Sequence, residues 1–90
     1  MKCEWDPAKA ASNLRKHGVS FEEAATALAD DYSITGADPE HSSGESRFIT
    51  FGLSNVRRLL VVSHTERGEA LRIISARRAT KQERRIYEES

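Results

Sequence analysis

The sequence predicts a single α+β domain, in which a short N-terminal strand and two helices precede an antiparallel meander of three to four strands and a C-terminal helix. Three observations support this prediction. Apolar side chains recur at helical spacing in residues 7–31, alternating segments joined by short turns fill residues 45–77, and a capping box at Thr80 opens a last helix. A chain of 90 residues is expected to build one core and one domain.

The composition argues against several classes of protein. Hydrophobic residues make up 38% of the chain and charged residues 31%, and no apolar run approaches the roughly 18 residues that a membrane-spanning helix needs. No apolar signal segment follows Met1, so we expect a cytoplasmic protein that does not contact a membrane. A single cysteine, Cys3, excludes an internal disulfide, and the three histidines lack the spacing of metal ligands. We therefore expect no metal and no other cofactor.

The N-terminal part begins with a predicted strand at residues 2–5. Asp6 can cap the helix that follows. Pro7 suits its first turn, because backbone N–H groups there have no partner within the helix and proline, which has no N–H, loses no hydrogen bond. The helix should end near His17, where Gly18 provides a left-handed C-cap.

The two N-terminal helices each have an apolar face. In the first helix this face is thin, and Asn13 is expected to point away from it; the face consists of Ala10, Ala11 and Leu14. The second helix starts at a predicted capping box formed by Ser20 and Glu23. Its stripe should lie on the sheet and consists of Phe21, Ala24, Ala25 and Leu28.

Strands dominate the middle of the chain. Residues 32–35 are expected to form a brief strand, and the polar, turn-rich residues 36–44 predict an exposed loop. Three strands are then predicted at residues 45–51, 58–65 and 70–77, the second of them apolar on both phases and therefore central.

Basic residues gather in the last third of the chain, although the net charge is zero. Residues 1–56 carry 5 basic and 9 acidic side chains, and residues 57–90 carry 9 basic and 5 acidic, giving −4 and +4. Such a polarity suits either a nucleic acid or an acidic protein as partner. The final helix, which the Thr80 capping box opens, continues this basic stretch.

Specific strings follow one another along the chain, namely Trp5-Asp6-Pro7-x-Lys9, Asn13-x-x-Lys16-His17-Gly18-Val19-Ser20-Phe21, Asp30, Glu45-x-Arg47, Gly52, Arg72-Ile73-Ile74-Ser75-Ala76-Arg77-Arg78-Ala79, Glu83-Arg84 and Tyr87. These strings, together with the order of the predicted elements, resemble the BrnT family of bacterial type II toxins. The resemblance implies a RelE-like fold and metal-independent RNA cleavage that inhibits translation and growth. It also implies a BrnA-like antitoxin partner, whose ribbon-helix-helix domain binds operator DNA, and a hetero-oligomer with that antitoxin.

Metal-free RNA cleavage needs cations that stabilise a charged phosphorane and groups that transfer protons. Arg77 and Arg78 are the candidate stabilisers, because a guanidinium pairs with phosphate oxygens through two parallel donors. His64 is the candidate proton-transfer residue, but the family pattern does not supply this role, so it depends on local chemistry alone. His41 is interpreted as a loop residue. Strand alternation predicts that Arg72 and Arg78 share a face of the sheet.

Four further residues are candidates for RNA binding, namely Arg72, Lys81, Arg84 and Tyr87. Lys81 begins a helix, where a phosphate can also meet free backbone amides, and an aromatic ring such as Tyr87 can stack on a base. Two alternatives remain open. The arginines could instead pair with Glu45, Glu69 or Glu83 on a solvated surface. The protein could also be a non-catalytic module that binds an antitoxin and acts as corepressor at operator DNA.

Overall fold

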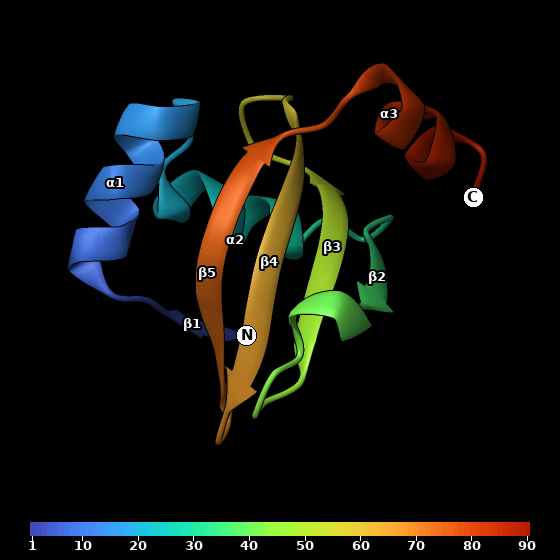
Figure 1. Cartoon of the computed structure of the whole chain (residues 1–90). Coiled ribbons are helices and arrows are strands. Elements are labelled where there is room, and N and C mark those ends of the chain that lie inside the picture. Colours follow the sequence, from blue (N-terminus) through green and yellow to red (C-terminus); the bar gives the residue numbers. More distant parts are fainter.

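Five strands and three α-helices form an α+β fold in the computed structural model, which describes residues 1–90 (Figure 1). The elements are β1 (Lys2–Glu4), α1 (Pro7–His17), α2 (Phe21–Leu28), β2 (Ile34–Ala37), the 3-10 helix η1 (Pro39–His41), β3 (Arg47–Leu53), β4 (Leu59–Arg67), β5 (Ala70–Arg78) and α3 (Lys81–Glu88). The predicted order of helices and strands is confirmed, with strand ends displaced by one to two residues.

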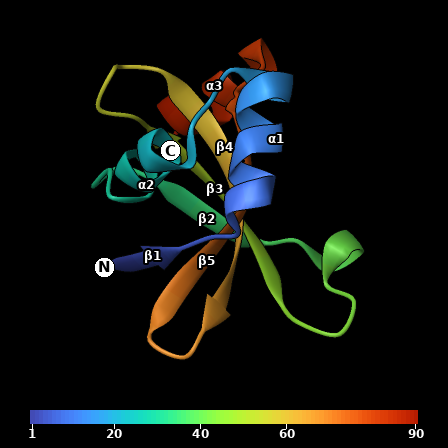
Figure 2. The ribbon, with the colours of Figure 1, turned by 90° about the vertical axis from the view of Figure 1, so that its left-hand side faces the viewer.

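The strands form one mixed sheet in the order β1-β5-β4-β3-β2. Strands β2 to β5 make an antiparallel meander, and β1 adds a parallel strand beside β5. Helix α2 and the turn that contains η1 lie on opposite sides of this sheet (Figure 2). We call the side opposite α2 the open face.

A β-bulge in β5 changes which side chains reach the open face. Ser63 of β4 pairs with Ser75, but the next residue along β4, His64, pairs with Ile73, so Ile74 is the extra residue. A bulge reverses the alternation of side chains along its strand. The alternation of side chains between the two faces of the sheet is therefore reversed after Ile74, compared with the residues before it.

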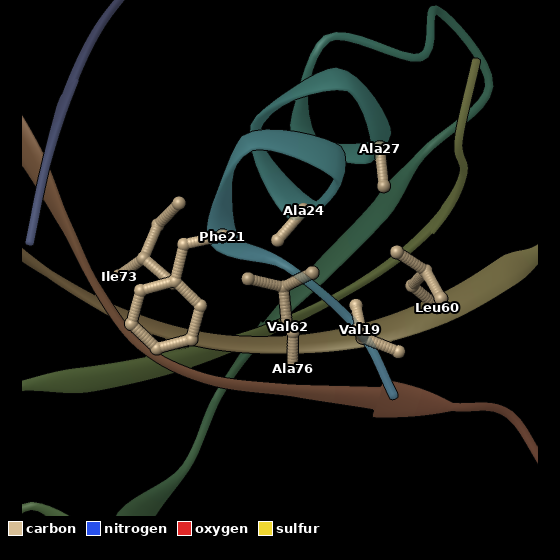
Figure 3. Packing of buried hydrophobic residues seen from close by; sticks show 8 residues of the cluster. All are labelled: Val19, Phe21, Ala24, Ala27, Leu60, Val62, Ile73 and Ala76. Atoms are coloured by element: carbon tan, nitrogen blue, oxygen red, sulfur yellow. The ribbon is translucent and has the colours of Figure 1, made fainter. Parts of the chain in front are cut away.

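The hydrophobic core lies between α2 and the sheet (Figure 3). Eight fully buried side chains pack there, namely Val19, Phe21, Ala24, Ala27, Leu60, Val62, Ile73 and Ala76. The predicted apolar stripe of α2 supplies two of them, Phe21 and Ala24, while its other two members, Ala25 and Leu28, are partly buried against the cluster. Trp5 meets Phe21 edge to face, with ring centroids 6.0 Å apart.

Asn13 corrects the prediction made for α1. The side chain points inward rather than away, and its amide nitrogen donates to the carbonyls of Val19 at 2.9 Å and Ala76 at 2.8 Å. Its oxygen accepts from the Ala76 N–H at 3.1 Å. β1 pairs only with the beginning of β5. Further along the same edge, the Asn13 amide provides hydrogen-bond partners for the backbone N–H and carbonyl of Ala76. Leu14, expected on the apolar face, is 51% exposed.

The cap of α2 also differs from its prediction. The Ser20 hydroxyl accepts from the Glu23 N–H at 3.0 Å, as expected, but the Glu23 carboxylate does not reach back to Ser20. It instead accepts from Arg58 Nε at 2.9 Å and from the Ser54 hydroxyl at 2.7 Å. These bonds lower the pKa of Glu23, with the Arg58 bond as the main cause. At Thr80 the complete capping box is present.

Candidate functional site

The open face contains a groove made of two adjoining hollows. The first has a volume of about 270 Å³ and is mainly apolar; it is lined by Ile34, Gly36, Ala37, Ile49, Phe51, Val61, Arg77 and Glu83. The second, of about 320 Å³, is lined mostly by polar residues and is called the polar hollow; its residues are Asp38, His41, Arg47, Ile49, Val61, Ser63, Ile74, Ser75 and Arg77. Because Arg77 lines both, its side chain lies where the hollows meet. We call the two hollows together the open-face groove.

Arg77 is presented to this groove by β5 and held there by α3. It pairs in the sheet with Val61, another groove residue. Its two terminal nitrogens donate to the two carboxylate oxygens of Glu83 at 2.8 Å each. These bonds lower the pKa of Glu83 to about 2 and raise that of Arg77, so both groups stay charged at neutral pH. The Arg77 side chain remains 43% exposed, which leaves donors available to a ligand.

Arg47, at the start of β3, brings a second cation to the polar hollow. It belongs to none of the ion pairs in the structure. Arg47 was part of the Glu45-x-Arg47 string but was not among the predicted site residues. The hollow is therefore lined by two arginines, one on β3 and one on β5, the strands on either side of β4. Their guanidinium groups can pair with an anion that enters the hollow.

The two other predicted arginines of β5 do not join Arg77 in one place. Arg72 pairs with Thr65 and Arg78 with Leu60, five residues apart on β4, so their side chains lie on opposite faces. The prediction that they share a face is wrong, because the bulge at Ile74 reverses the phase between them. Arg78 is on the same side of β5 as the core residue Ala76, which is the side that faces α2. Arg72 forms an ion pair with Glu4 at 3.3 Å.

His64 lies on the core side of the sheet and is 5% exposed. Its Nε2 lies 2.7 Å from the Thr50 hydroxyl, and its Nδ1 has no hydrogen-bond partner. Its ring stacks on that of Phe48, with the two ring centroids 5.9 Å apart. Burial lowers the pKa of His64, although the charge of Glu66 opposes this effect. His64 is not brought together with Arg77.

The predicted residues of α3 have separate surroundings. Lys81 is exposed in the first turn, and Arg84 makes an exposed ion pair with Glu88 at 3.9 Å. The Tyr87 hydroxyl donates to Asp30 at 2.5 Å, which raises the pKa of Tyr87 to about 12. Tyr87 thus attaches α3 to the end of α2.

A third, smaller hollow of about 190 Å³ lies beside α1 and adds basic residues that the prediction missed. It is lined by Lys9, Ser12, Asn13, Lys16, His17, Ile74 and Ser75. It meets the open-face groove at the bulge, since both include Ile74 and Ser75. The spacing of Lys9 and Lys16, seven residues apart on one helix face, was a signal in the sequence for this placement.

Two further features of the whole chain concern metals and membranes. No group of three or more His, Cys, Asp or Glu side chains is arranged to hold a metal ion. None of the helices has the length and apolar character needed to cross a lipid bilayer.

Comparisons with known proteins place these observations in context. Residues 5–83 match the family model described as "Ribonuclease toxin, BrnT, of type II toxin-antitoxin system". Among solved structures, the 1.1 Å crystal structure of the Brucella abortus ribonuclease toxin BrnT matches with a TM-score of 0.65 and 28% sequence identity. The match covers 90% of this chain and 99% of that chain. A search of the curated proteins found no match.

Proposed function

The chain belongs to the BrnT family of ribonuclease toxins of type II toxin-antitoxin systems, and on this premise we propose that it cleaves RNA in the open-face groove without a metal ion. The membership confirms the resemblance drawn from the motifs. The observation that supports the location is the convergence of Arg77 and Arg47 on one polar hollow. The proposed setting is the cytoplasm, where cleavage of messenger RNA inhibits translation and growth.

The proposed chemistry uses the ribose 2′-hydroxyl as nucleophile. Attack on the neighbouring phosphorus builds negative charge on its oxygens, and fixed guanidinium groups stabilise such charge without reorganising. Arg77 is the leading stabiliser because Glu83 fixes its orientation. Arg47 supplies the second cation in place of Arg78, which lies on the α2 side.

RNA on either side of the reacting phosphate needs further contacts. Arg72 of β5 lies on the open face of the sheet, and Lys81 and Arg84 are exposed on α3. On the other side, the hollow with Lys9 and Lys16 continues the groove past the bulge. We propose that these cations bind flanking phosphates, in line with the role that phosphate contacts usually have in positioning a nucleic acid.

Cleavage assays test the ribonuclease proposal. Purified protein is incubated with RNA in EDTA, and separately with messenger RNA in a cell-free translation mixture, and the cleavage products are mapped. We expect products with a 2′,3′-cyclic phosphate and a 5′-hydroxyl. Intact RNA in both assays, from a folded protein, would refute the proposal.

Matched variants test the site. Arg77→Ala should reduce the cleavage rate by about 10²–10³-fold if its guanidinium stabilises the phosphorane. Arg15→Ala removes an equal charge from the exposed surface of α1, outside all three hollows, and should change the rate by less than about threefold. Arg78→Ala, tested separately, should resemble the Arg15 control because it lies on the other face of the sheet. Equal losses in Arg77→Ala and Arg78→Ala would contradict the placement of the site.

A second proposed function is binding of an antitoxin, and the apolar hollow favours it. Ile34, Ile49, Phe51 and Val61 line that hollow beside Arg77. An apolar side chain of a partner could fill it while an acidic side chain paired with the arginine. We propose a BrnA-like antitoxin with a ribbon-helix-helix domain as this partner, in a hetero-oligomer that binds operator DNA through the antitoxin.

Calorimetry with the antitoxin tests this second function. Phe51→Ala should weaken antitoxin binding, with a less negative heat-capacity change than the wild type because less apolar surface is buried. Binding that is unchanged in Phe51→Ala, in a variant shown to be folded, would place the antitoxin elsewhere.

A further inference from the structure

The turn between β2 and β3 places a histidine and an aspartate at the open-face groove. His41 Nδ1 lies 2.8 Å from Asp38 Oδ2, and both residues line the polar hollow with Arg47 and Arg77. The His41 side chain is 63% exposed, whereas that of Asp38 is 12% exposed. An exposed imidazole is thus held by a largely buried carboxylate beside two cations.

Hydrogen bonds fix this turn to the sheet. The Asp38 N–H donates to the Arg47 carbonyl at 2.8 Å. The Ser42 hydroxyl donates to the Asp38 carbonyl at 2.6 Å and accepts from the Arg47 N–H at 3.0 Å. The single turn of η1 then carries His41 back over Asp38. The imidazole is therefore positioned by the same residues that begin β3.

The geometry points to His41, positioned by Asp38, as the proton-transfer residue of the RNA-cleaving site. This inference rests on the proposed ribonuclease activity and adds a residue to it. A carboxylate on Nδ1 selects the tautomer with the proton on that nitrogen, which leaves the Nε2 lone pair free to accept a proton. The carboxylate also stabilises the imidazolium that results.

No other titratable side chain in the groove offers the same chemistry. The charged or titratable residues that line the polar hollow are Asp38, His41, Arg47 and Arg77. Arginine does not act as a proton donor or acceptor in proteins, and Asp38 is engaged with His41. In the apolar hollow the one carboxylate, Glu83, is bonded through both oxygens to Arg77. His64 lies on the opposite side of the sheet. The proton-transfer role that the sequence suggested for His64 therefore passes to His41.

The proposed step balances within the site. Nε2 of His41 takes the proton of the 2′-hydroxyl as the 2′ oxygen forms a bond to phosphorus, and the P–O5′ bond breaks. The imidazolium then gives that proton to the departing 5′ oxygen. The products are a 2′,3′-cyclic phosphate and a 5′-hydroxyl, and the imidazole returns to its neutral state. Arg77 and Arg47 stabilise the phosphorane throughout.

Rates measured with saturating RNA test the role of His41. His41→Ala should lower the cleavage rate by about 10²–10⁴-fold, the usual contribution of general acid–base catalysis. Its affinity for RNA that carries a 2′-deoxyribose at the cleavage position should change by less than about threefold. Added imidazole should restore part of the lost rate, which a purely structural role would not allow. Glu40→Ala, an exposed neighbour in η1 outside the groove, is the matched control and should keep the wild-type rate.

Asp38 is tested as a positioning residue. The imidazole ¹⁵N spectrum of the wild type should show the Nδ1–H tautomer for His41, and Asp38→Asn should lose this preference together with at least about tenfold in rate. The outcomes separate the two proposals. If Arg77→Ala abolishes cleavage while His41→Ala stays within about threefold of the wild type, the inference about His41 is wrong and the ribonuclease stands. If the wild type cleaves no RNA, the proposed function itself fails.

Discussion

The guanidinium of Arg77 and the carboxylate of Glu83 share two parallel hydrogen bonds of 2.8 Å, which join β5 to α3 at the edge of the open-face groove. This pairing holds the arginine in a fixed orientation, but it also places a negative charge where RNA phosphates are expected. The two effects make opposite contributions to RNA binding.

We predict that Glu83→Gln strengthens RNA binding by up to about fivefold at low salt, because it removes a negative charge that competes with phosphate for Arg77, and a partly exposed charge–charge interaction is worth up to about 1 kcal/mol. Fluorescence anisotropy with a 2′-deoxy-substituted RNA measures the affinity. Glu89→Gln removes an equal charge from the end of the same helix, at an exposed side chain that belongs to none of the ion pairs, and is the matched control. Weaker binding by Glu83→Gln would show that orienting Arg77 matters more than the charge.

The same pair should make stability depend on pH. The pKa of Glu83 falls from an ordinary value of 4.5 to about 2 in the folded protein. A depressed pKa stabilises the fold above the unfolded value, and this contribution disappears as the pH falls from about 4.5 toward 2. The Tm difference between wild type and Glu83→Gln should therefore be larger at pH 7 than at pH 2.5. A difference that does not change over this range would contradict the prediction.

The parts of the fold that local pattern encodes were predictable from the sequence. Helix ends at Gly18 and Thr80 have capping residues of known preference, and the meander has short turns between alternating segments. The bulge at Ile74 could not be predicted, because nothing in the apolar string around it shows which residue is extra. That one residue decided which arginines share a face, and hence which of them meet in the groove.

The candidate site was harder to predict because its residues come from distant segments. Asn13 bonds to a strand residue 63 positions away, so its spacing on α1 alone suggested a solvent-facing side chain. Asp38 and His41 are three residues apart, a visible signal for a hydrogen-bonded pair. Their position beside Arg77 depends on the pairing of β2 with β3 and of β4 with β5, which places the turn over the sheet.

Tyr87→Phe should loosen α3 without unfolding the domain. The Tyr87 hydroxyl donates to Asp30, which also accepts from the Leu53 N–H at 2.9 Å, and α3 has no buried residue. A hydrogen bond to a charged group contributes about 1.5–3 kcal/mol. Amide hydrogen exchange in residues 81–88 should therefore become faster, while exchange in β4 stays unchanged. Tyr32→Phe, at a side chain that is 80% exposed, is the control and should leave α3 protected.

Gly52→Ala should destabilise the protein by about 1–3 kcal/mol or more, because it overpacks a closed interface. A Cβ at Gly52 would lie 2.1 Å from the Ala27 carbonyl oxygen, so α2 would have to move away from β3. Gly36 of β2 has open space at the same position and makes Gly36→Ala a matched control. Urea unfolding should show a lower midpoint for Gly52→Ala only, and similar midpoints for the two variants would mean that α2 adjusts at little cost.

Asn13→Ala should be among the most destabilising substitutions in α1. It would leave the Ala76 N–H and the carbonyls of Ala76 and Val19 without their present partner in a buried setting. Each buried polar group that loses its partner costs about 1–3 kcal/mol, so a total loss of at least about 2 kcal/mol is expected after water enters. Leu14→Ala, the exposed neighbour, should change the free energy of unfolding by less than about 0.5 kcal/mol. Urea titrations of both variants measure the difference. If both lose equally little, the amide of Asn13 does not hold the edge of β5.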